Sequence, residues 1–78
     1  MATLAYRRTA RRWARRYAAK LFPGAPLGGF TEHPTVPGAY VLAVLDRGGR
    51  HVANIYARPS AGLIGVDHIA ATSTEGSN

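Results

Sequence analysis

Arginine pairs recur every four residues along the first part of this chain. The pairs are Arg7-Arg8, Arg11-Arg12 and Arg15-Arg16, and Lys20 follows them. Because four residues are close to one turn of an α-helix, pairs with this spacing lie on one side of a helix. The pattern predicts an amphipathic helix over residues 3–22. Its apolar face, which we expect to pack in the core, carries Tyr6, Ala10, Trp13, Ala14, Tyr17, Ala18 and Leu21.

A segment rich in proline and glycine follows the predicted helix. Pro23-Gly24 ends the helix, because proline removes a backbone donor and glycine permits a sharp reversal. Residues 23–38 hold four of the five prolines and four of the nine glycines. We expect a connecting loop over this range, with a short extended piece at residues 30–32. A loop of this length in a small domain is expected to be either a binding loop or a mobile one.

Three β-strands are predicted in the rest of the chain, over residues 39–46, 50–58 and 63–70. These segments are apolar, contain several β-branched residues and are separated by turn sequences. A helix packed on such a sheet supplies the stability that a lone hairpin lacks. The sequence therefore predicts an α+β fold, in which one N-terminal basic helix covers a small three-stranded antiparallel sheet. Residues 1–71 make a single domain, and we expect residues 72–78 to form a flexible tail.

The turn between the first two predicted strands permits two registers. A two-residue turn at Gly48-Gly49 places Arg47 opposite Arg50, and like charges in that position are unfavourable. A three-residue turn places Asp46 opposite Arg50 instead, and we favour it. In the favoured register, one face of the hairpin groups Val41, Ala43, Leu45, Ala53, Ile55 and Ala57.

The basic residues of the predicted helix have no acidic neighbours in the sequence. The chain has ten Lys or Arg against four Asp or Glu, a net charge of +6, and residues 1–31 hold seven of these bases and no acid. Like charges four residues apart each destabilise a helix by about 0.2–0.5 kcal/mol. An external polyanion removes this repulsion; the alternative is an idle solvated face. The candidate contacts for nucleic acid or an acidic partner are Arg7, Arg8, Arg11, Arg12, Arg15, Arg16, Lys20, Arg47 and Arg50.

Two functions agree with this charge pattern. The first is a small basic protein that contacts the phosphates of DNA or RNA without strong sequence specificity. The second is a protein inhibitor or adaptor of the phage or mobile-element type, similar in size and style to anti-CRISPR proteins, which binds an acidic surface of a host protein or nucleoprotein complex. For that second function, Tyr40, Tyr56 and Arg58 are candidate partner anchors, because the favoured register makes the two tyrosines cross-strand neighbours.

Other kinds of chemistry find little support in the sequence. The chain has no cysteine, which removes thiol catalysis and thiolate metal sites and fits a cytoplasmic location. His33, His51 and His68 lie on different segments without the paired spacing of metal ligands. Ser60 has no base arranged near it, and the glycine pairs fit no phosphate-binding fingerprint. We therefore expect no enzyme activity, no metal, no cofactor and no membrane association.

Overall fold

The arginine-rich segment forms a single α-helix. In the computed structural model, which describes residues 4–69, α1 spans Leu4–Leu21. The N–H of Phe22 still donates to Ala18 O at 2.7 Å, and Pro23 has no N–H to continue the ladder. Gly24 then adopts a φ of +75°, which reverses the chain. The helix therefore ends where the proline and glycine require.

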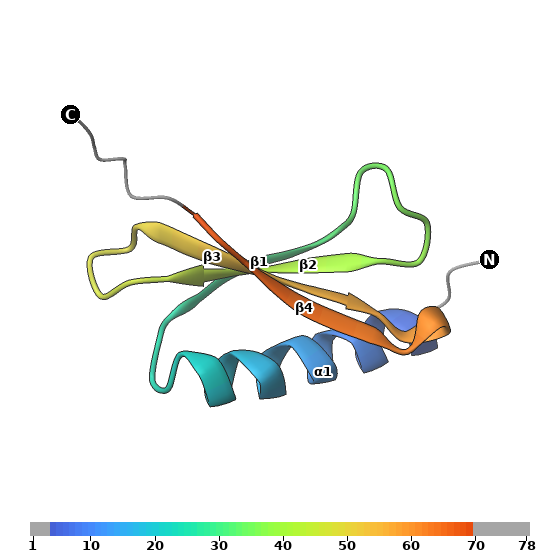
Figure 1. Cartoon of the computed structure of the whole chain (residues 1–78), viewed down its shortest axis with the longest axis horizontal. Helices are drawn as coiled ribbons and strands as arrows, with labels where there is room; N and C mark the ends of the chain where they lie inside the picture. The colour runs from blue at the N-terminus through green and yellow to red at the C-terminus, as the bar shows by residue number, and fades with distance from the viewer. Residues whose placement is uncertain (1–3, 70–78) are drawn as a thin grey trace.

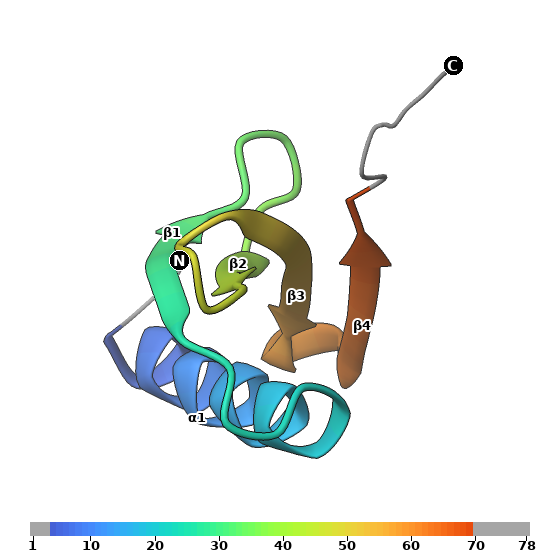
Figure 2. The ribbon, with the colours of Figure 1, turned by 90° about the vertical axis from the view of Figure 1, so that its left-hand side faces the viewer.

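Within residues 4–69, four strands follow the helix and form one antiparallel sheet (Figures 1 and 2). β1 is Leu27–Glu32, β2 is Tyr40–Leu45, β3 is His51–Arg58 and β4 is Leu63–His68, in the spatial order β1-β2-β3-β4. A single 3-10 turn, Pro59–Ala61, joins β3 to β4. The predicted α+β class is confirmed, but the sheet has four strands rather than three. The predicted tail over residues 72–78 lies outside the described residues.

The additional strand, β1, lies within the loop predicted over residues 23–38. Leu27 and Phe30 pair with residues of β2 that are only two positions apart, so Gly28 and Gly29 form a β-bulge. β1 is held by hydrogen bonds to a strand that is distant in the sequence, and a glycine pair weakens the local strand signal. The propensity of this segment therefore predicted only a short extended piece.

The helix covers the face of the sheet formed by β2 and β3 (Figure 2). Ala10, Ala14 and Ala18 are at most 1% exposed. Because these side chains are small, the helix backbone approaches the sheet closely. Burial of each large aliphatic side chain of the sheet stabilises the fold by about 1.5–3 kcal/mol. The buried sheet residues of this core are Tyr40, Leu42, Val44, Ala53, Ile55 and Ala57.

The aromatic side chains of the helix lie at the margin of this core. Trp13 and Tyr17 are half-buried and pack against it. Tyr6 and Leu21 are 44% and 42% exposed, so the expectation that they belong to the core is wrong. We call Ala10, Ala14 and Ala18 the alanine stripe. It occupies the centre of the buried helix face, where a larger side chain would push the helix away from the sheet, and the aromatic residues lie on either side of it.

The hairpin of β2 and β3 combines both registers that the sequence allowed. At the turn, the N–H of Asp46 donates to Arg50 O at 2.8 Å, so the favoured three-residue turn is confirmed. Beyond the turn, β3 carries an extra residue at Val52, and this bulge shifts the pairing by one position. A shift of one residue moves every side chain to the other face. The predicted grouping of β2 residues is therefore wrong: Val41, Ala43 and Leu45 lie on the face away from α1.

Candidate functional site

The six arginines of α1 form two parallel rows, and all six side chains are exposed. Residues four apart share a side of the helix, and neighbouring residues are turned by about 100°. We call Arg7, Arg11 and Arg15 the inner row, because they line a hollow against β1. We call Arg8, Arg12, Arg16 and Lys20 the outer row, which lies one position further round the helix.

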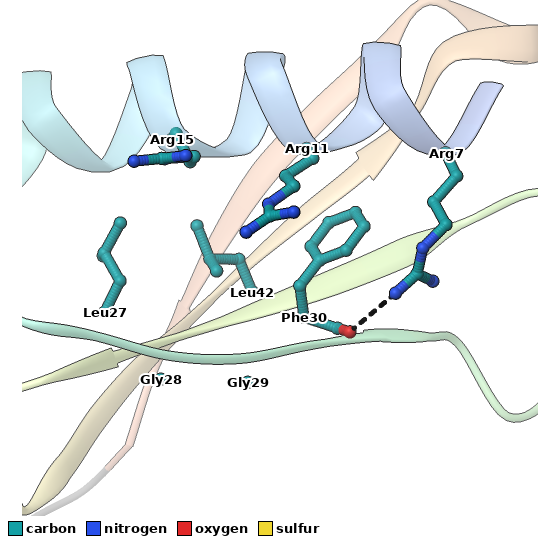
Figure 3. Close-up of a pocket in the computed structure, with 8 residues that line it drawn as sticks. All are labelled: Arg7, Arg11, Arg15, Leu27, Gly28, Gly29, Phe30 and Leu42. Atoms are coloured by element: carbon teal, nitrogen blue, oxygen red, sulfur yellow. Dashed lines mark hydrogen bonds between the residues drawn. The ribbon is translucent and has the colours of Figure 1, made fainter. Parts of the chain in front are cut away.

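The inner row forms one wall of a groove between α1 and β1 (Figure 3). We call this hollow the α1–β1 groove; its volume is about 450 Å³. In Figure 3, the side chains of Arg7 and Arg11 extend from the helix toward the sheet, that of Arg15 lies along the helix, and Leu27 and Phe30 extend from β1 toward the helix. The sheet side of the groove consists of Leu27, Gly28, Gly29 and Phe30 of β1 and Leu42 of β2.

The bulge in β1 gives the groove its apolar wall. In a regular strand, residues three apart face opposite sides of the sheet. Because Gly28 and Gly29 form a bulge, Leu27 and Phe30 both pair with residues of the buried face of β2, Val44 and Leu42. Both side chains are therefore on the helix side of the sheet. The groove depends on this bulge, because a regular strand would place only one of these two side chains on the helix side of the sheet.

Arg7 is anchored at one end of the α1–β1 groove. Its Nη2 donates a long hydrogen bond of 3.4 Å to Phe30 O. The guanidinium carbon lies 5.1 Å from the centroid of the Phe30 ring and 6.0 Å from that of Tyr40. The two rings are stacked, with centroids 5.4 Å apart and planes 12° apart. A guanidinium over aromatic rings at an exposed site gains about 0.5–1 kcal/mol, which holds this positive charge in place.

Arginines of both rows surround a second hollow, on the helix itself, that is more open to solvent. It has a volume of about 490 Å³ and is lined by Arg8, Arg11, Arg12 and Arg15. Four guanidiniums around one hollow repel one another, and each has five N–H donors to offer. The arrangement has the charge and the donors that a phosphate oxygen requires.

The carboxylates that the structure describes are engaged elsewhere or stand apart. Asp46 Oδ1 accepts hydrogen bonds from the backbone N–H groups of Gly48 and Arg50, each at 2.9 Å. Asp67 Oδ2 accepts a long hydrogen bond of 3.4 Å from Tyr56 OH. Within residues 4–69, none of these groups forms an ion pair with an arginine of α1. The positive charge of the two rows therefore faces solvent.

The hairpin tip does not join this surface. Arg47 lines a separate hollow with residues 22–26, at the end of the molecule where α1 ends. Arg50 is exposed in the turn, where its backbone N–H and C=O are bonded to Asp46. The structure thus brings together the arginines of α1, whereas the two hairpin arginines form a distinct pair of charges.

The predicted tyrosine pair does not form. The bulge in β3 places Tyr40 opposite Ala57 and Tyr56 opposite Val41, so the two tyrosines lie on opposite faces of the sheet. Tyr40 is 3% exposed and belongs to the core. Tyr56 is half-buried on the other face, with its ring centroid 5.9 Å from that of His33. As neighbouring anchors for a partner, the two residues were predicted wrongly.

Arg58, the third predicted anchor, is half-buried at the end of β3. Its Nε is buried and has no hydrogen-bond partner within residues 4–69. The side chain lines an apolar hollow together with His33, Tyr56 and Leu63. It is on the sheet face away from α1 and is separate from the two arginine rows.

The groove residues of β1 were not among the predicted site residues. Leu27, the two glycines and Phe30 lie in the segment interpreted as a connecting loop. The sequence does carry a signal for this strand, because a Gly-Gly pair between two apolar residues is typical of a bulged strand. A search for strict alternation of apolar residues misses such a strand.

Other sites receive no support among the described residues. Within residues 4–69, no three His, Asp or Glu side chains form a group that could hold a metal ion. His33 Nδ1 instead accepts hydrogen bonds from the backbone N–H groups of Thr35 and Val36, both at 3.1 Å. In the same part of the chain, no helix combines the length and apolar character that a membrane span requires.

Comparison with known proteins gave no relative: no protein-family model, curated protein or solved structure matches this chain. The function is therefore inferred from the charge and geometry of the surface described above.

Proposed function

We propose that the protein binds nucleic acid by placing the arginines of α1 against its phosphates. The observation that supports this most strongly is the pair of exposed guanidinium rows on one helix, without an ion-paired carboxylate among residues 4–69. Each guanidinium presents a planar fork that matches two phosphate oxygens. A surface of this kind binds polyanions in preference to single anions, because neighbouring arginines act together.

Repulsion within the rows favours binding of an anion. Arginines four residues apart on one helix repel each other, by about 0.2–0.5 kcal/mol per pair. Phosphates placed between them remove that repulsion, and the displaced counterions add a favourable entropy. Phosphate contacts position a protein on nucleic acid without reading its bases. We therefore expect weak sequence specificity.

The inhibitor function is less well supported, because its anchors and its charges are on different surfaces. Protein interfaces depend on a few large side chains that fill pockets of the partner. Tyr40 is buried, and Tyr56 is on the sheet face away from α1. A flat acidic protein surface cannot meet both Tyr56 and the arginine rows, whereas nucleic acid needs only the rows.

The salt dependence of binding tests the proposal. Affinity for duplex DNA is measured by fluorescence anisotropy over a range of NaCl concentrations. Engagement of five or six arginines predicts a slope of about −5 in a log–log plot of affinity against salt. Replacing Arg12 and Arg16 by Gln should make the slope less steep by about 2. An affinity that does not respond to ionic strength would rule the proposal out.

A pull-down after nuclease treatment separates nucleic acid from a protein partner. We expect the material captured by the tagged protein to disappear when nuclease is added. A stoichiometric protein partner that survives nuclease would favour the inhibitor function instead.

A further inference from the structure

The α1–β1 groove combines two kinds of surface that a duplex does not engage together. Its helix side carries the three guanidiniums of the inner row, and its sheet side carries Leu27, Phe30 and Leu42. A duplex offers phosphates on its outside and keeps its base faces stacked within. An unpaired strand exposes both phosphates and base faces, and proteins bind such strands through a basic groove with aromatic side chains. The lining of this groove therefore matches an unpaired strand.

The size of the groove also favours an unpaired strand over a duplex. Its volume of about 450 Å³ is in the range of sites that enclose small ligands, about 300–1,000 Å³. It has room for a short piece of one strand. A duplex, whose major groove alone is about 12 Å wide, cannot enter it and would meet α1 only from outside. A duplex therefore meets the two rows from their solvent side only, whereas a single strand also passes between the inner row and β1.

The inner row places positive charges at regular intervals along the groove. Residues four apart on a helix are separated by about 6 Å along its axis. Neighbouring phosphates of one strand are separated by a similar distance, so a strand parallel to α1 can place one phosphate at each of Arg7, Arg11 and Arg15.

One end of the groove is arranged before any ligand binds. Arg7 is bonded to Phe30 O, and the Phe30 ring is supported by the stacked ring of the buried Tyr40. Groups that are already in place lose less conformational freedom on binding. These features make the groove a prepared site.

We propose that the α1–β1 groove holds one strand of single-stranded nucleic acid, so that the protein prefers unpaired DNA or RNA to a duplex. This inference rests on the proposed function and assigns different contacts to the two rows. The inner row contacts phosphates inside the groove, the apolar wall contacts base faces, and the outer row adds phosphate contacts outside it.

Two substitutions with the same effect on net charge test this proposal. Leu27→Glu places a carboxylate in the groove opposite Arg15, whereas Leu63→Glu places one on β4, at the other edge of the sheet. Leu27 and Leu63 are 37% and 58% exposed, so neither is part of the buried core. Affinity is measured by anisotropy for oligothymidylate and oligouridylate of about 12 nucleotides and for a duplex of the same length.

We expect a loss of affinity only for the Leu27→Glu variant, and only for single strands. The unmodified protein should bind both single strands at least about tenfold more tightly than the duplex, a difference of about 1.4 kcal/mol. Leu27→Glu should abolish that preference, and Leu63→Glu should retain it. Comparison of oligothymidylate with oligouridylate shows whether the groove accepts DNA, RNA or both.

A second pair of variants guards against disruption of β1 by Leu27→Glu. Arg7→Gln and Arg8→Gln remove the same charge from adjacent exposed positions, and only Arg7 lines the groove. Arg7→Gln should weaken single-strand binding more than duplex binding, whereas Arg8→Gln should weaken both equally. Equal affinity for single strand and duplex, with equal effects in both pairs of variants, would overturn this inference and leave the proposed function standing. Failure to bind any nucleic acid at low salt would overturn both.

Discussion

At the residue scale, Ala10, Ala14 and Ala18 set how closely α1 lies on the sheet. They are almost fully buried, and they face Val44, Ile55 and other residues of β2 and β3. A short approach distance brings the inner row near β1, because the helix and β1 both flank the same strand, β2. The width of the α1–β1 groove thus depends on side chains that no ligand touches.

We expect Ala14→Leu to destabilise the protein by about 1–3 kcal/mol, because the added atoms have no space between helix and sheet. The measurement is the free energy of unfolding in urea. Ala19 is exposed on the same helix, and Ala19→Leu should change stability by no more than about 0.5 kcal/mol. If the two variants are equally stable, the helix does not pack through its alanine stripe.

At the scale of elements, the turn between β2 and β3 is held by one side chain. Asp46 Oδ1 accepts from two backbone N–H groups of the turn, and Asp46 N–H begins the pairing of the strands. Gly49, with a φ of +84°, completes the reversal. The turn fixes the position of β2, and β2 in turn carries β1 and one side of the core.

Removal of the Asp46 carboxylate should destabilise the hairpin. We expect Asp46→Ala to lower the free energy of unfolding by about 1 kcal/mol, because two backbone donors lose their acceptor. Asp46→Asn removes the same charge but keeps an oxygen acceptor, so it should recover most of the loss. Urea unfolding of both variants is the measurement. Equal losses would assign the effect to charge rather than to the hydrogen bonds.

At the scale of the whole molecule, positive charge is concentrated on one side of α1. Seven of the ten basic residues belong to this helix, and the hairpin arginines are at one end of the sheet. Charges on exposed side chains interact over about 10 Å at 0.1 M salt. The stability of the free protein therefore depends on the salt concentration as well as on packing.

We expect NaCl to stabilise the free protein. Screening of the like-charge pairs should recover about 1 kcal/mol between low and moderate salt, which corresponds to a rise in Tm of about 4–8 °C for a domain of this size. The measurement is thermal unfolding followed by circular dichroism. A variant in which Arg8, Arg12 and Arg16 are replaced by Gln should be more stable at low salt and respond less to NaCl. A Tm that falls with added salt would show that the arginines are neutralised within the protein.

The helix, its basic face and the three-residue turn could be predicted from the sequence because they depend on neighbours. Arginine pairs four residues apart share a side of a helix regardless of what packs behind them. Pro23-Gly24 ends the helix locally, and Asp46 selects the turn through contacts with residues at most four positions away. The candidate phosphate contacts on α1 could also be predicted from the sequence, because the helical period alone places these arginines on one side of the helix.

Only the tertiary structure decided which residues stand opposite the arginines. β1 exists because β2 supplies its hydrogen bonds, and its bulge turns Leu27 and Phe30 to the same side. The bulge at Val52 likewise decided that Tyr40 is buried and Tyr56 is not. Strand side chains alternate with a period of two, so one inserted residue reverses a whole face, and only pairing with a distant strand shows where it is inserted.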